Sequence, residues 1–155
     1  MAWLDLAAFG TMALLAVVGS VLDVRFRLLP NLLCAAVLVS GLAFGLAQHG
    51  LPWTGSAAIH AVLALLAGMA LFAAGMIGGG DAKYYAAFAA WFPLSKAALL
   101  LLMVSVPGVL LVTVTWFAGR HRIASDFPAS RRDFAKVPYG VAISAGAVLT
   151  QLMIA

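Results

Sequence analysis

The sequence predicts an all-α, polytopic membrane protein with about six transmembrane helices and with its N- and C-termini outside. The 155-residue chain is 65% hydrophobic and only 9% charged, too few charges to cover a soluble domain of this size. Apolar segments long enough to cross a bilayer alternate with short polar ones. We find no internal repeat and no second domain, so residues 1–155 are expected to form a single membrane-embedded unit.

The charged residues and the cysteine content exclude several classes of function. The net charge of +4 does not indicate nucleic-acid binding, because the basic residues cluster at segment ends, where they set orientation and meet anionic lipid. The one cysteine, Cys34, excludes an internal disulfide and a multi-cysteine zinc site. No cofactor or metal is expected. The chain has no glutamate, and its acids are Asp5, Asp23, Asp81, Asp126 and Asp133.

The first half of the chain predicts three spans. The first covers residues 3–22 and runs toward the cytosol, because arginines follow it directly. The second, 31–48, runs outward, and after an uncharged turn the third, 56–77, returns to the cytosolic side. Asp23 and Asp81 are therefore expected on the same side of the membrane, although two spans separate them.

The second half predicts three more spans, at about 82–92, 96–118 and 137–154. The fourth span, with 11 residues, reaches only about 17 Å as a helix. It is too short to cross alone, and either begins below the surface or continues through a kink. The polar loop 119–136 carries five basic residues and is expected in the cytosol. His60, near the outer end of the third span, is interpreted as an interfacial or packed histidine.

The stretch Gly78-Gly79-Gly80-Asp81 lies between two apolar segments. Glycine lacks a Cβ atom, so other backbone can approach closely here. A carboxylate beside hydrocarbon is costly, about 2.5–3.5 kcal/mol at a helix centre, and indicates a functional site. Alternatively, Asp81 is only the N-cap of the next helix and the glycines are a helix stop.

A second acid decides between these interpretations. Asp23 and Asp81 both adjoin apolar sequence on the expected cytosolic side. Two acids that share a site cannot both ionise easily, so one holds a proton near neutral pH. One can then act as a general base on water while the other donates to a peptide carbonyl. Asp126 and Asp133 lie among arginines in the polar loop and are expected to be ordinary ionised acids.

Three sequence elements resemble those of the type IV prepilin peptidases, which are GxGD membrane aspartic proteases. Gly78–Asp81 with the following Ala-Lys83 is similar to their G-G-G-D-x-K element. The run Asp23–Asn31 is similar to D-x-R-x-x-x-(I/L)-P-N, and Pro-Tyr-Gly at 138–140 is similar to a third element that opens the last helix. The chain length resembles the small subgroup that serves tight-adherence, Flp-type pili.

The resemblance implies a membrane-embedded aspartic peptidase in the bacterial inner membrane, with its active site facing the cytosol. Its partners would be membrane lipid and a prepilin with an N-terminal leader helix; oligomeric state stays open. Larger members add a segment with paired CxxC motifs and N-methylate the product, and this chain shows neither feature, so we expect cleavage without methylation. The implied catalytic pair is Asp23 and Asp81. The residues implied to bind substrate or shape the site are Gly78, Gly79, Gly80, Lys83, Pro138, Tyr139 and Gly140.

Several alternatives remain. A small membrane transporter would place polar residues deep within the spans, where this sequence is almost wholly apolar. A non-catalytic scaffold of a pilus or secretion machine would not need both aspartates. An intramembrane protease of broader type would cut within a transmembrane helix, whereas this pair lies at the boundary. Lys83 is two residues from Asp81 and cannot face it on a regular helix, so it either anchors the helix at the interface or tunes the acids or meets an acidic substrate residue.

Overall fold

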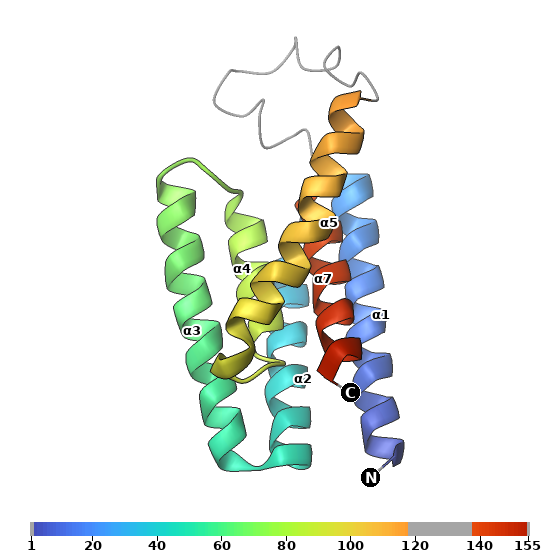
Figure 1. The fold of residues 1–155 in the computed structure, drawn as a ribbon, viewed down its shortest axis with the longest axis vertical. Helices are drawn as coiled ribbons and strands as arrows, with labels where there is room; N and C mark the ends of the chain where they lie inside the picture. The colour runs from blue at the N-terminus through green and yellow to red at the C-terminus, as the bar shows by residue number, and fades with distance from the viewer. Residues whose placement is uncertain (1, 118–137, 155) are drawn as a thin grey trace.

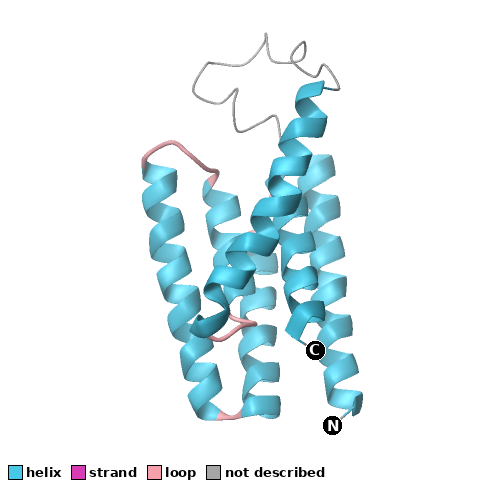
Figure 2. Ribbon diagram, in the orientation of Figure 1, coloured by secondary structure: helices cyan, strands magenta, loops and turns pink. Residues whose placement is uncertain are grey.

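The computed structural model of the protein describes residues 2–117 and 138–154, and these residues form helices and connecting turns without a strand (Figure 2). This confirms the predicted all-α class. In chain order the elements are α1 (Ala2–Phe26), α2 (Asn31–His49), α3 (Leu51–Ala73), α4 (Gly79–Ala89), the 3-10 turn η1 (Leu94–Lys96), α5 (Ala97–Phe117) and α7 (Tyr139–Ile154).

Four of these segments are long and apolar enough to cross a membrane: Trp3–Phe26, Asn31–His49, Leu51–Ala73 and Leu94–Thr115. Helix α4 has 11 residues and α7 has 16, so the two are shorter than a full span. The protein is therefore a polytopic membrane protein, and α4 is as short as the sequence predicts.

The third helix has different ends from those expected. It begins at Leu51 rather than residue 56, because Gly50 alone, with φ of 79°, reverses the chain after α2. Only glycine adopts this backbone conformation without strain, and Pro52 fits the first helical turn that follows. The helix ends at Ala73 rather than residue 77, so the chain reaches the glycines through a short turn.

The helices run alternately up and down the bundle (Figure 1). Helix α1 ends, and α4 and α7 begin, at one end of the bundle, which we call the aspartate end because it carries Asp23 and Asp81. The N-terminus and the turn between α2 and α3 lie at the opposite end. The two aspartates thus lie at the same end of the bundle, as the count of spans predicts.

The connection from α4 to α5 lies inside the bundle rather than at its end (Figures 1 and 2). In a membrane, backbone that leaves a helix at this depth must find hydrogen-bond partners in the protein or in water. Two side chains of α3, one turn apart, supply them. The Nδ1 atom of His60 lies 3.0 Å from the Phe92 carbonyl oxygen, and the Leu94 N–H donates to Ser56 Oγ at 3.0 Å.

Replacing His60 with leucine should destabilise the protein by about 1–3 kcal/mol, because the Phe92 carbonyl would lose its partner in a buried place. His60 is only 3% exposed, so water cannot easily replace it. The midpoint of thermal unfolding in detergent should fall by several degrees. His60→Asn, whose amide can donate from a similar position, should recover part of the loss, and an unchanged midpoint in His60→Leu would contradict this role.

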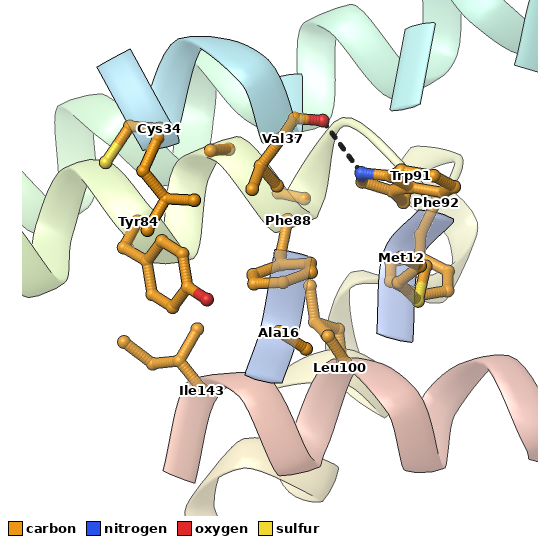
Figure 3. Close-up of a cluster of buried hydrophobic side chains, with 14 of the residues drawn as sticks. Met12, Ala16, Cys34, Val37, Tyr84, Phe88, Trp91, Phe92, Leu100 and Ile143 are labelled. Carbon is orange, nitrogen blue, oxygen red and sulfur yellow. Dashed lines mark hydrogen bonds between the residues drawn. The ribbon is translucent and has the colours of Figure 1, made fainter. Parts of the chain in front are cut away.

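The core of the bundle is built around α4 and the turn that follows it (Figure 3). Tyr84, Phe88 and Phe92 are fully buried, and side chains from α1, α2, α5 and α7 pack on them. Trp91 donates from Nε1 to the carbonyl oxygen of Val37 on α2 at 2.8 Å. Apart from the exposed Lys83, the residues of α4 from Ala82 onward are buried or partly buried, and this packing holds the first turn that carries Asp81.

Candidate active site

Asp23 lies in the last turn of α1, and its side chain is buried, with 6% exposure. The N–H of Gly140 donates to Asp23 Oδ2 at 2.7 Å, whereas the N–H of the next residue, Val141, donates to the carbonyl oxygen of Pro138 at 3.1 Å. Gly140 belongs to the first turn of α7, where its N–H has no partner within the helix and the helix dipole favours an anion. The start of α7 therefore binds the end of α1 through this carboxylate.

Asp81 lies in the first turn of α4, but it is not the N-cap of that helix. The N-cap is Gly78, and Asp81 is the third helical residue. Its carboxylate reaches back and accepts a hydrogen bond from the Gly78 backbone, as the third residue does in a capping box. An added Cβ at Gly78 would lie 2.7 Å from Asp81 Oδ2. The alternative that Asp81 is the N-cap is therefore wrong, because Gly78 occupies that position. The missing Cβ of Gly78 leaves room for the Asp81 carboxylate.

Burial, as the larger cause, and the negative charge of Asp23 together raise the pKa of Asp81 from 3.8 to about 6. Such an effect requires the two acids to lie close to one another. The two carboxyl groups, which come from different helices, thus lie close enough for the charge of Asp23 to act on Asp81, whose pKa lies about one unit below neutral pH.

The raised pKa of Asp81 predicts that stability falls as pH rises from about 4 to 6. In this window the folded protein holds a proton at Asp81 that the unfolded chain has released, so stability is greatest at low pH and is lost as the carboxyl ionises. The shift corresponds to roughly 2–3 kcal/mol. Melting curves from pH 4 to pH 7 should show a smaller decline in Asp81→Asn than in the wild type. Equal declines in the two proteins would contradict the assignment.

The other residues of the G-G-G-D-x-K element have separate environments. Gly79 lies under the ring of Phe72, where an added Cβ would be 3.3 Å from the ring, and Gly80 faces Leu29, at 3.6 Å. Lys83 is exposed, and its Nζ donates to Asn31 Oδ1 at 3.3 Å. The side chain of Lys83 thus contacts the start of α2. This agrees with the expectation that Lys83 does not face Asp81 on the helix.

In the third element, Pro-Tyr-Gly at 138–140, the residue whose backbone contacts Asp23 directly is Gly140. Pro138 is buried just before α7, and Tyr139 is 40% exposed. Asp126, Asp133 and the rest of the loop 119–136 lie outside the described residues. The structure therefore places Gly140, and not Tyr139, against the carboxylate.

Sequence reasoning missed a polar contact that joins the helices carrying the two acids. The hydroxyl groups of Tyr84 and Ser144 are 2.9 Å apart, and Tyr84 also donates to the carbonyl oxygen of Leu15 at 3.4 Å. An added Cβ at Gly19 would overlap the Tyr84 hydroxyl. The available signal was helical spacing, since Tyr84 is three residues after Asp81 and shares its face.

The arrangement can perform acid–base chemistry with two carboxyl groups. Within residues 2–117 and 138–154, no group of three or more His, Cys, Asp or Glu side chains is placed to hold a metal ion. Backbone N–H groups orient both acids, and apolar helices limit the water around them.

Comparison with known proteins gives one finding. The searches of curated proteins and of solved structures returned no match. Residues 10–113, more than half of the 155, match the model of the type IV leader peptidase family. The matched range contains both Asp23 and Asp81. On this match, the chain belongs to the type IV leader peptidase family.

Proposed function

We propose that this protein is an aspartic peptidase that removes the leader peptide from Flp-type prepilins at the cytosolic face of the bacterial inner membrane. The observation that carries the proposal is that Asp23, in the last turn of α1, and Asp81, in the first turn of α4, lie at the same end of a membrane bundle. Family membership supplies the reaction class. The Flp-type substrate class is the narrower part of the proposal, and co-expression with a prepilin tests it.

The proposed mechanism needs one proton between the two acids. The ionised carboxylate takes a proton from a water molecule, which attacks the carbonyl carbon of the scissile peptide bond. The protonated carboxyl donates to the carbonyl oxygen. As the intermediate collapses, the leaving amine takes the proton that the first carboxyl removed from water, and a hydroxyl of the intermediate returns its proton to the second carboxyl. The N–H groups of Gly140 and Gly78 keep the two carboxyl groups in position throughout.

The cytosolic placement is supported by the distribution of basic residues. Arg25 in the last turn of α1 and Arg27 directly after this helix lie at the aspartate end, and the segment 119–136, which follows α5 in the sequence, is rich in arginine. Positive residues are retained on the cytosolic side. A peptide bond near the membrane surface could reach the aspartates from this side without crossing the bilayer.

The test is co-expression with a candidate Flp-type prepilin, with leader removal read as a shift on a gel. Cleavage that requires this chain supports the proposal, and a prepilin that stays intact beside well-inserted enzyme contradicts it. A panel of prepilins with exchanged leader sequences would distinguish a wrong substrate from an absent activity.

We further propose that this chain cleaves without methylating the product. The support is the cysteine content of the chain, since Cys34 is buried in α2 and no CxxC pair is present in the sequence. Mass spectrometry of the mature substrate should show a free N-terminal amine. A 14-dalton increment that depends on this chain alone would contradict the proposal.

A further inference from the structure

A cavity of about 630 Å³ lies at the end of the bundle opposite the aspartates. It is bounded by the first turns of α1, the last turns of α2 and α7, and the turn that follows α4. Along α1, the 18 residues from Asp5 to Asp23 span about 27 Å, close to the thickness of the hydrocarbon core. This cavity is therefore separate from the candidate active site and lies near the other membrane surface.

The short α4 explains why a cavity exists here. This helix ends at Ala89, and the chain turns back within the bundle (Figure 1). The space that a longer helix would fill is left open between α1, α2 and α7. Trp91 and Lys96, which follow α4 in the chain, are among the residues that line this space.

The cavity lining is strongly polar for so apolar a chain. Asp5, Gln48, Lys96 and Gln151 all line it. The amide of Gln48 donates to Asp5 Oδ1 at 2.9 Å. Lys96 is partly buried at the start of the turn into α5, which lies deeper in the bundle than the start of α1 (Figure 1). The backbone of Lys96 thus joins the cavity lining from deeper in the bundle, whereas Asp5 joins it from the first turns of α1, nearer the membrane surface.

Two tryptophans form rigid walls, because glycines allow them to pack tightly on α2. An added Cβ at Gly41 would lie 2.6 Å from the ring of Trp91, and one at Gly45 would overlap the ring of Trp53. Trp53 also packs against His49 with ring centroids 4.7 Å apart. The cavity is thus defined by packed aromatic side chains, which is typical of a preformed binding site.

We propose that this cavity binds the headgroup of a phospholipid that carries a primary amine. In such a lipid the phosphate lies toward the acyl chains and the amine lies outward. That order matches Lys96 in the deeper part and Asp5 nearer the surface. An ammonium group can donate to the Asp5 carboxylate, and Lys96 can donate to the phosphate. Apolar residues of the lining, such as Phe44 and Ile154, face the glycerol and acyl portion.

The test is thermal unfolding of the purified full chain in mixed micelles with short-chain phosphatidylethanolamine, phosphatidylcholine or phosphatidylglycerol. At about ten times Kd, phosphatidylethanolamine should raise the unfolding midpoint about 3–6 °C more than the other two. The quaternary ammonium of phosphatidylcholine has no N–H to donate, and phosphatidylglycerol has no amine. Equal shifts from all three lipids would overturn the proposal.

Three variants locate the effect. Asp5→Asn should remove the preference for phosphatidylethanolamine over phosphatidylcholine, and Lys96→Gln should weaken the response to every phospholipid. Lys83→Gln, which removes an ammonium group at the aspartate end, is the matched control and should keep the preference. If Lys96→Gln does not accumulate, Gly45→Ala tests the same cavity by displacing Trp53, and it should also lose the preference.

Two further outcomes would count against the proposal. A retained preference in Asp5→Asn would show that the amine is recognised elsewhere. An equal shift from glycerophosphoethanolamine, which has no acyl chains, would show that the cavity takes a free phosphate ester rather than a lipid. The measurement does not use leader cleavage, so it is independent of the proposed peptidase activity.

Discussion

Replacing either Asp23 or Asp81 with asparagine should abolish leader cleavage, with a loss on the order of 10³-fold or more. Asparagine keeps the shape of the side chain and can still accept hydrogen bonds from Gly140 or Gly78, but it cannot exchange a proton. If one proton is shared between the two acids, neither can take over the role of the other. Initial rates of leader removal, measured with equal amounts of inserted enzyme, test this expectation.

The double variant should be no slower than either single variant, because residues that act as one unit have non-additive effects. Asp5→Asn is the matched control, since it removes the same kind of side chain at the opposite end of the bundle, and it should cleave at the wild-type rate. Insertion should persist in all variants, because removing a charge does not penalise burial in a membrane. Near-native cleavage by well-inserted Asp23→Asn would exclude the pair.

The location of Asp23 and Asp81 at the same end of the bundle could be predicted because it depends on features that a sequence displays directly. Apolar length gives the number of crossings between the two acids, and arginines after the first helix give its direction. An even number of crossings returns the chain to the same side of the membrane, and this does not depend on the residues at which each helix begins and ends. Errors of several residues in the limits of α3 therefore left the relation between the two acids unchanged.

The contacts that position these acids could not be predicted, because each joins distant parts of the chain. Gly140 lies 117 residues from the carboxylate that it binds, and its motif gave no indication of which of its residues would touch Asp23. His60 appeared as a packed histidine, yet its partner is a carbonyl 32 residues away, in a turn that no helical pattern reveals. Such partners depend on how helices cross, and helical periodicity gives only which face is apolar.

Gly140→Ala should lower the cleavage rate about 100-fold while the protein still inserts. The backbone N–H that binds Asp23 is kept, but the new Cβ would lie 2.8 Å from Asp23 Oδ2 and 3.0 Å from both its Cβ and its Cγ. Either the carboxylate or the start of α7 must then move. A displacement of about 1 Å at a reacting group is enough for a loss of this size.

Two glycines where α5 and α7 pack together serve as controls. They distinguish a displaced Asp23 carboxylate from a general loss of stability. At Gly108 an added Cβ would only touch Ala142 at 3.8 Å, so Gly108→Ala should keep both cleavage and stability. At Gly146 it would lie 2.5 Å from Val104, including its backbone, so Gly146→Ala should lower the unfolding midpoint through the helix crossing. Gly140→Ala should instead lose far more activity than its unfolding midpoint explains. If it cleaves as fast as Gly108→Ala, the contact between α7 and Asp23 has no part in holding the catalytic carboxylate.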